Sequence, residues 1–236
     1  EAISAVGKSF IGTEYVGNTL EVNPTSEKLV INLTGLDCVT FVENCLTFAR
    51  CLKDNRTSFE DYKKELEKIR YRDGIIDGYV SRLHYFTDWI YNNQEKEIVK
   101  DITQEIGGVV YDKKINFMST HPKSYKKLSV KNNLEQIKNT EEAINSRNYY
   151  YIPKDNISPI YDSLQTGDII GTTTNIPGLD VTHTGFVYKK EDGGTYFMHA
   201  SLKNKQVIIS DNSLADYVGE DSKKTGIIIA RPQEVK

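Results

Sequence analysis

The sequence predicts an α+β fold in which helices pack on an antiparallel sheet. Three observations support this fold class. The first half of the chain carries apolar residues at helical spacing, the second half carries short β-rich runs, and the connections between those runs are too short for βαβ crossovers. The 236 residues are 38% hydrophobic, which is enough to bury one substantial core. We therefore expect a single unit over residues 1–236.

The first half predicts three helices after the turn-rich stretch "IGTEYVGN". The first runs from Asp37 to Leu52, with Asp37 as its N-cap. The second lies in "SFEDYKKELEKIRY", where Ser58 and Asp61 have the spacing of a capping box. The third spans "GYVSRLHYFTDWIYNN", in which apolar residues recur at helical spacing; these residues are Tyr79, Leu83, Phe86 and Ile90.

The second half predicts strands, with one helix at 132–147. The strand candidates are "GDIIGTTT", "HTGFVYKK", "TYFMHAS", "KQVIIS" and "TGIIIAR", each bounded by Gly, Asp or Asn. We therefore expect a mainly helical lobe over about 1–104 together with the helix at 132–147. A mainly β lobe would then comprise about 105–131 and 149–236.

The charge pattern argues against nucleic acid as a partner. The formal net charge is −3, the pI is about 5.9, and the lysines alternate with acidic residues as on a solvated helix face. No run of 18 apolar residues suggests a membrane span. The chain begins at Glu1 and shows no signal-peptide pattern, which leads us to expect a mature or trimmed chain.

The three cysteines do not suggest a disulfide scaffold or a zinc site. Cys38, Cys45 and Cys51 form no CxxC pair. On one helix, Cys38 and Cys45 would be separated by roughly 10 Å, beyond the reach of a disulfide. We expect Cys45 and Cys51 to be buried as small apolar residues.

Cys38 differs because it would lie in the first turn of its helix. Free backbone N–H groups and the positive end of the helix dipole stabilise a thiolate there, so we expect an accessible thiol of low pKa. Two histidines on neighbouring predicted strands, His183 in "DVTHTGFVY" and His199 in "YFMHAS", could supply a base and a group that orients it. His121, in "STHPKSY", is expected to lie in a loop.

These motifs resemble a known family. "DC..FV", "L.TGDII", "HTGFVY" and "MHAS", in this order, resemble the NlpC-type papain-like hydrolases of bacterial cell walls, and "FIGTEYVG" resembles their Gly-Thr-x-Tyr segment. From end to end the chain is similar to the N-acetylmuramoyl-L-alanine amidase-like family within that superfamily. The runs that carry this resemblance are "NLTGLDCVTFVEN", "SRLHYFTDWIYNN", "FMSTHPKSY" and "GLDVTHTGFVY".

The resemblance implies a papain-like fold, with the Cys38 helix packed on an antiparallel sheet or small barrel that carries the histidines. By position, Cys38 matches the nucleophile, His183 the general base and His199 the residue that orients the base. Tyr15 matches the tyrosine beside the nucleophile, which could donate to an oxyanion. No metal or cofactor is implied.

One departure from the superfamily pattern follows the cysteine. Val39 and Thr40 stand where Ser-Gly is usual, so no role of that serine can be transferred. The stretch from about Asn55 to Pro159 is also much longer than in a minimal module of this type. We expect it to build the walls around the cleft.

Four residues are candidates for substrate binding: Arg82, His84, Tyr85 and Asp180. The Arg82 guanidinium could clamp a carboxylate, although pairing with a surface acid is an equal alternative. Asp168, in "TGDII", is expected to cap a turn and to have no catalytic role.

The resemblance implies a cysteine amidase that cleaves the bond between N-acetylmuramic acid and L-alanine in peptidoglycan fragments. Two alternatives remain open: an endopeptidase that cuts between γ-D-glutamate and the diamino acid, and a non-catalytic muropeptide-binding protein. We expect a monomer in the periplasm or cell envelope of a bacterium, with peptidoglycan fragments as its partners.

Strand parity constrains the histidine pair. A two-residue turn at Asp192-Gly193 would put His183 and His199 on opposite faces of the sheet. A loop from Lys189 to Gly193 would instead set the two histidines opposite each other. We therefore expect "KKEDG" to be loop, the histidines to lie opposite or diagonal to each other, and both rings to point toward the Cys38 helix.

Overall fold

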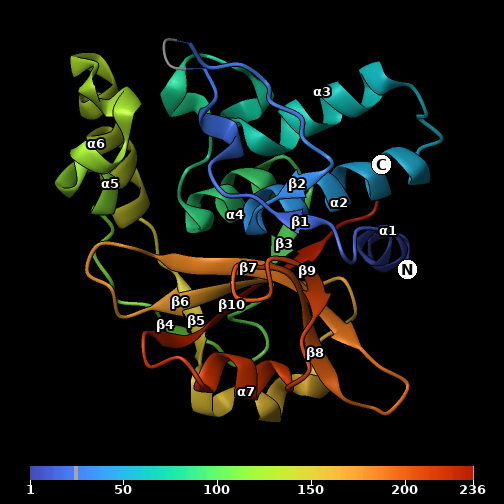
Figure 1. The fold of residues 1–236 in the computed structure, drawn as a ribbon. Helices are drawn as coiled ribbons and strands as arrows, with labels where there is room; N and C mark the ends of the chain where they lie inside the picture. Colours follow the sequence, from blue (N-terminus) through green and yellow to red (C-terminus); the bar gives the residue numbers. More distant parts are fainter. Residues whose placement is uncertain (24–25, 236) are drawn as a thin grey trace.

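The computed structural model describes residues 1–23 and 26–235 and shows a ten-stranded sheet with helices on both faces (Figure 1). The helices are α1 (Ala2–Ser9), α2 (Cys38–Lys53), α3 (Phe59–Arg70), α4 (Phe86–Glu95), α5 (Phe117–Thr120), α6 (Lys131–Asn145) and α7 (Leu214–Gly219). The strands are β1 (Glu14–Tyr15), β2 (Gly35–Leu36), β3 (Val99–Asp101), β4 (Val109–Val110), β5 (Tyr150–Pro153), β6 (Ile169–Thr174), β7 (Val181–Lys189), β8 (Thr195–Ser201), β9 (Gln206–Ile209) and β10 (Lys224–Pro232). Within the described ranges, no helix is long and apolar enough to cross a membrane.

The sheet is almost entirely antiparallel, as expected from the short connections. Its strands follow the order β2-β1-β9-β8-β7-β6-β10-β5-β4, and β3 pairs with β10 outside this path. Among the named strands of the described residues, β1 and β2 are the one parallel pair. The five strands predicted from the second half are present as β6 to β10, whereas β1, β2 and β3 are contributed by the first half, which the sequence predicted as helical.

The two faces of the sheet bury two separate apolar clusters, because side chains alternate along each strand. Phe186 and Met198 face helices α2 and α4, and their cluster includes Phe41 and Trp89. Val187 and Phe197 face the opposite side, where Leu214 of α7 covers them. Figure 1 shows α2, α3 and α4 above the sheet and α7 below it.

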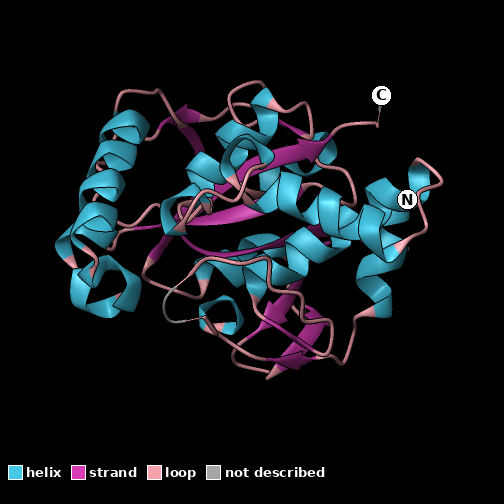
Figure 2. Ribbon diagram, turned by 90° about the horizontal axis from the view of Figure 1, so that it is seen from above, coloured by secondary structure: helices cyan, strands magenta, loops and turns pink. Residues whose placement is uncertain are grey.

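A third apolar cluster joins α5 and α6 to the segment before α4. It contains Tyr79, Tyr85, Met118 and Ile137. Figure 2, seen from above, shows these helices at one end of the molecule, while α1 lies at the other end. The long stretch between Asn55 and Pro159 therefore supplies α3, α4 and this lateral cluster.

Two predicted elements differ in the structure. The helix expected over "GYVSRLHYFTDWIYNN" is a short 3-10 turn at Tyr79–Ser81, then an extended residue at Arg82, and only then helix α4. The break is stabilised because the Asp180 carboxylate accepts the Thr87 N–H at 2.8 Å and so caps the new helix start. Residues 105–131 are not mainly β: only β4 is strand there, followed by α5 and short 3-10 turns.

Candidate active site

Cys38 is the first residue of helix α2, as the sequence predicted. Asp37 is the N-cap, its carboxylate accepts the Thr40 N–H at 2.8 Å, and the Thr40 hydroxyl accepts the Asp37 N–H at 2.9 Å. This capping box fixes the helix start and leaves the Cys38 thiol beside the unpaired N–H groups of the first turn. Thr40, which departs from the superfamily pattern, therefore has a structural role in holding the nucleophile candidate.

The thiol does not have the low pKa that the sequence predicted. Burial, followed by the nearby Asp37 carboxylate, raises the pKa of Cys38 to about 12. Hydrogen bonds from the backbone N–H groups of Thr184, Val39 and Cys38 itself act in the opposite direction, but burial outweighs them. The resting site therefore holds a neutral thiol whose sulfur already lies among hydrogen-bond donors.

His183 and His199 are joined by a hydrogen bond. His183 Nε2 lies 2.7 Å from His199 Nδ1, and the two rings meet edge to face with centroids 4.8 Å apart. Burial lowers the pKa of His183 well below its usual value, and burial with the nearby Lys224 cation lowers that of His199 to about 3. Both rings are therefore neutral near pH 7, and His183 Nδ1 is the ring nitrogen that lies outside this hydrogen bond.

The strand register explains how the two histidines meet. Pairs run from Lys189↔Thr195 to Phe186↔Met198, so the connecting loop comprises Lys190–Gly194 and Lys189 belongs to the ladder. Continued by one step, this register sets Gly185 opposite His199 and places His183 diagonal to it on the same face. The diagonal arrangement is thus confirmed, whereas the direct pairing that would follow from a Lys189–Gly193 loop is wrong by one residue on each strand.

Unlike His183, His199 does not line the cavity that contains Cys38, and the expectation that both rings point toward the α2 start stays a prediction. The His199 ring stacks on Phe197 with centroids 4.8 Å apart and contacts Tyr217 of α7 at 4.9 Å. These contacts place it on the α7 side of the sheet. His183 lines the cavity that contains Cys38. His199 can therefore act on the thiol through its hydrogen bond to His183.

Tyr15 lies close to the thiol, as the resemblance implied. Strand β1 pairs in parallel with β2, and Tyr15 is opposite Leu36, two residues before Cys38. Burial raises the pKa of Tyr15 to about 12, with further contributions from Cys38 and Asp37. The phenol is therefore protonated near neutral pH and able to donate a hydrogen bond.

Cys38 and His183 open into a cavity of about 240 Å³. Its walls come from β7, from the α2 start, from residues 18–21 and from the long stretch 55–159. Leu83, Phe86 and Trp89 from that stretch line the cavity. The expectation that this stretch builds walls around the cleft is thus confirmed.

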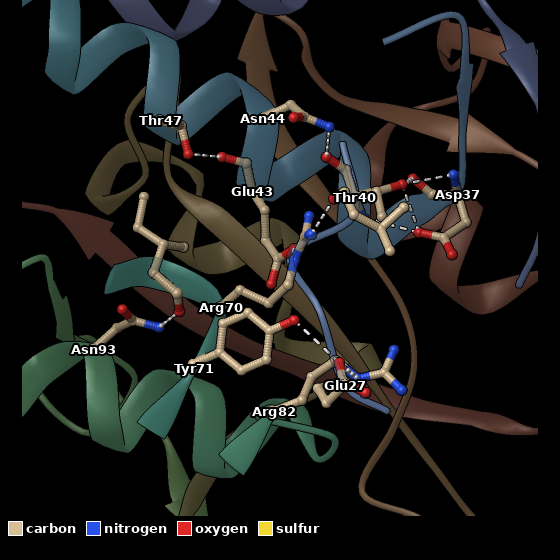
Figure 3. A network of polar contacts seen from close by, with 12 residues as sticks. Glu27, Asp37, Thr40, Glu43, Asn44, Thr47, Arg70, Tyr71, Arg82 and Asn93 are labelled. Atoms are coloured by element: carbon tan, nitrogen blue, oxygen red, sulfur yellow. Dashed lines mark hydrogen bonds and ion pairs between the residues drawn. The ribbon is translucent and has the colours of Figure 1, made fainter. Parts of the chain in front are cut away.

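Arg82 lies in the cavity wall and is also held by acidic side chains. Its guanidinium forms ion pairs with Glu21 and, at 3.2 Å, with Glu27. Glu27 is itself buried and accepts from Lys127 Nζ at 2.8 Å and from the Tyr71 hydroxyl at 3.0 Å. Figure 3 shows Arg82 and Tyr71 converging on Glu27. The guanidinium is therefore fixed in position by acidic side chains, as in the second alternative for Arg82, and its role as a carboxylate clamp stays a prediction.

The other three candidate binding residues have different surroundings. His84 lines the cavity, and its Nε2 lies 2.9 Å from the Tyr79 carbonyl oxygen. Asp180 also lines the cavity, but its carboxylate is engaged with Thr87. Tyr85 is buried in the third apolar cluster, where its hydroxyl donates to Glu141 at 2.7 Å. Tyr85 is a structural residue in this arrangement and is not a substrate-binding candidate.

A buried ion pair in the lining of the Cys38 cavity was not predicted from the sequence. Glu43, on α2, accepts from Arg70 Nε at 2.6 Å, and both side chains line the cavity (Figure 3). The sequence around Glu43 looks like that of any amphipathic helix, so only the partner on α3 reveals its burial. Asp168 pairs with Arg231 at 2.8 Å and accepts the Gln165 N–H at 2.8 Å, which confirms its structural role. No group of three potential metal ligands occurs among residues 1–23 and 26–235.

Comparisons with known proteins agree with this arrangement. The family described as N-acetylmuramoyl-L-alanine amidase-like (AmiA-like) matches residues 5–227. An N-acetylmuramoyl-L-alanine amidase from Bacteroides uniformis is 35% identical, with a TM-score of 0.92, and the match covers 99% of this chain and 98% of that one. No curated protein matches the chain.

Two further structures are similar. A Bacteroides fragilis protein, provisionally named a xylanase, is 37% identical with a TM-score of 0.89, over 96% of this chain and 99% of that one. A Legionella pneumophila protein is 22% identical with a TM-score of 0.76, over 99% of this chain and 89% of that one, and it supports the fold alone. With a family match over most of its length and an amidase relative above 30% identity, the chain belongs to the N-acetylmuramoyl-L-alanine amidase-like family.

Proposed function

We propose that the protein is a cysteine amidase that hydrolyses the amide between N-acetylmuramic acid and L-alanine in muropeptides. The observation that carries this proposal is the placement of Cys38 and His183 in one cavity, with His183 Nε2 bonded to His199 in a chain of this amidase-like family. We also propose that the protein is a papain-like hydrolase of the NlpC type.

The chemistry follows from the protonation states of the site. Cys38 Sγ attacks the lactyl carbonyl carbon while His183 Nδ1 takes the thiol proton, because His183 is neutral and its Nε2 is already engaged. The oxyanion is held by the Cys38 N–H and the Tyr15 hydroxyl. The imidazolium then protonates the alanine nitrogen, which leaves as an amine. Water activated by His183 cleaves the thioester, which releases the muramyl carboxylic acid.

The cavity walls supply the substrate contacts in this proposal. Arg82 supplies a cation in the cavity lining, and His84 and Asp180 line the same cavity. Because Glu21 is partly exposed whereas Glu27 is buried, a substrate carboxylate or carbonyl can replace Glu21 at the guanidinium without disturbing the Glu27 anchor. A bacterial cell envelope and a monomeric state are the setting we propose for this activity.

A glycosidase reading, suggested by one relative's name, is less compatible with the cavity. Glycoside hydrolysis commonly requires two free carboxyl groups that flank the sugar bond. The cavity carboxylates are already engaged: Asp37 caps α2, Glu43 pairs with Arg70, Asp180 caps α4 and Glu21 pairs with Arg82.

Product masses from a defined disaccharide-tetrapeptide test the proposal. The amidase releases the disaccharide and an intact tetrapeptide with a free L-alanine amine, and Cys38→Ala abolishes both products. Cleavage after D-glutamate would assign the endopeptidase activity instead. No turnover of the muropeptide together with retained binding would favour the muropeptide-binding protein.

A further inference from the structure

A second cavity, of about 640 Å³, lies on the α7 side of the sheet and shares Thr182 and His183 with the first. His199, Tyr217 and Lys224 also line it. Figure 1 shows α7 on the face of the sheet opposite α2. The two cavities therefore adjoin at Thr182 and His183, and of the two only the first contains Cys38.

One nitrogen in this second cavity lacks a partner. His199 is 2% exposed, and its Nε2 has no hydrogen-bond partner among the described residues. The proposed mechanism requires a free lone pair on His183 Nδ1, so His183 carries its hydrogen on Nε2 and donates to His199 Nδ1. His199 then carries its own hydrogen on Nε2. That hydrogen is a buried donor that needs an acceptor.

The nearest charged group in the same cavity is a buried lysine. Lys224 is 8% exposed, and its ammonium contacts the Tyr217 ring at 3.8 Å. Burial lowers the pKa of Lys224, and the nearby Asp221 and Glu220 carboxylates counteract this, but no ion pair with Lys224 forms within the described part of the chain. The acidic residues of this cavity, Asp211, Glu220 and Asp221, are more exposed than Lys224. Glu220 accepts from Asn212, and Asp221 accepts the Lys223 N–H at 2.9 Å. Lys203 is the remaining cation and is exposed at the rim.

We propose that the second cavity binds a carboxylate of the peptide leaving group, which accepts the His199 Nε2 hydrogen and pairs with Lys224. This inference rests on the proposed amidase function. A stem peptide carries several carboxylates, and an anion is the acceptor that a buried lysine and a buried N–H donor bind most favourably. The bound carboxylate would complete a relay from Cys38 through His183 and His199, so the substrate itself supplies the acceptor that His199 Nε2 lacks.

The role of the carboxylate is to position the base. It holds the hydrogen of His199 on Nε2, which keeps Nδ1 as an acceptor and thereby keeps His183 in the tautomer that can take the thiol proton. A substrate without the carboxylate would still reach Cys38. Without the carboxylate, the histidine pair could adopt the opposite tautomers. In these, His183 Nδ1 carries a hydrogen and cannot accept the thiol proton.

Binding of the peptide alone tests the site without requiring turnover. We would titrate L-alanyl-γ-D-glutamate, and the same dipeptide with both carboxyl groups converted to amides, into protein with ¹⁵N-labelled histidine. Ring-nitrogen shifts would report the tautomers of His183 and His199. The free acid is expected to fix the Nε2–H form of His199, and the diamide is expected to have no effect.

Variants of the two lysines separate a specific contact from general charge. Lys224→Met, which keeps the apolar stem against Tyr217, should weaken binding of the free dipeptide at least tenfold, and Lys224→Arg should restore part of it. Lys203→Gln, which removes an equal charge from the rim, should leave binding unchanged. Circular dichroism would verify that each variant is folded.

Equal binding of acid and diamide, or equal losses in Lys224→Met and Lys203→Gln, would overturn the proposal. In that case disaccharide-tetrapeptide hydrolysis could still proceed and would leave the amidase function intact. Conversely, dipeptide binding that depends on Lys224, with no hydrolysis of any muropeptide, would retain the carboxylate site and remove the amidase.

Discussion

His183 Nε2 lies 2.7 Å from His199 Nδ1, although the two residues are diagonal rather than directly opposite on β7 and β8. The Cβ atoms of diagonal neighbours are too far apart for direct contact. The two imidazole rings therefore span the distance between the strands. The ring of His199 is held between Phe197 and Tyr217, which leaves its Nδ1 directed at His183. The orientation of the base therefore depends on apolar packing as well as on the hydrogen bond.

Replacing His199 distinguishes an orienting role from simple packing. His199→Asn keeps a carbonyl oxygen that can accept the His183 Nε2 hydrogen, whereas His199→Phe keeps the ring stack but offers no acceptor. We expect kcat for muropeptide hydrolysis to fall by roughly 10²-fold or more in the phenylalanine variant, with little change in KM, and to fall less in the asparagine variant. Equal kcat values in the two variants would reduce His199 to a core residue.

Gly185 is expected to be required for the histidine pair. A Cβ at this position would lie 2.6 Å from the Met198 carbonyl oxygen and 2.8 Å from His199 Cβ, which is closer than atoms approach in real structures. We expect Gly185→Ala to force β7 away from β8, to lower kcat and to destabilise the fold by about 1–3 kcal/mol. Kinetics and urea unfolding measure both effects.

Gly219→Ala is the matched control for this substitution. Gly219 ends helix α7, and a Cβ there would meet nothing within 4 Å. Its activity and unfolding midpoint should remain close to those of the parent protein. A Gly185→Ala variant that behaves in the same way would show that β7 and β8 tolerate a wider separation at the histidines.

Alkylation of Cys38 is expected to depend on pH in the manner of a high-pKa thiol. Because burial raises the pKa of Cys38 to about 12, the iodoacetamide rate should keep rising from pH 7 to pH 10 without reaching a plateau. Modification of Cys38 should abolish activity, and Cys45, which is fully buried, should remain unmodified. Mass spectrometry of the alkylated protein identifies the site. A plateau below pH 7 would instead indicate a thiolate paired with His183.

Local sequence signals correctly predicted the elements that carry the site. The Asp37 cap, the Ser58 capping box and the strands of the second half follow from residue patterns of four to eight positions, and all are present. Parity also limited the histidines to opposite or diagonal positions. The exact register could not be derived, because it depends on whether Lys189 remains in the ladder, and a lysine there is compatible with either strand or loop.

Features that depend on long-range contacts could not be predicted from local sequence patterns. The break before α4 requires Asp180 to cap Thr87, a contact across 93 positions. The high pKa of Cys38 arises from its burial in the tertiary structure, which the favourable position at a helix start did not reveal. Tyr85 looked like a cleft residue beside His84, yet its hydroxyl is directed to Glu141 on α6.

The buried neutral histidines should make the fold sensitive to mild acid. Burial is the main cause that lowers the pKa values of His84, His183 and His199 below 6.5, so as pH falls through 6.5 the unfolded chain takes up protons that the folded protein does not. The stability that is fully present above pH 6.5 is therefore lost progressively toward the lower folded pKa.

Each such histidine should contribute up to about 1.4 kcal/mol of this loss per pH unit. Urea unfolding at pH 7.0 and pH 5.5 measures the difference, and His84→Gln should reduce it by about one histidine's share. An unfolding free energy that is the same at both pH values would mean that these histidines become protonated within the folded protein.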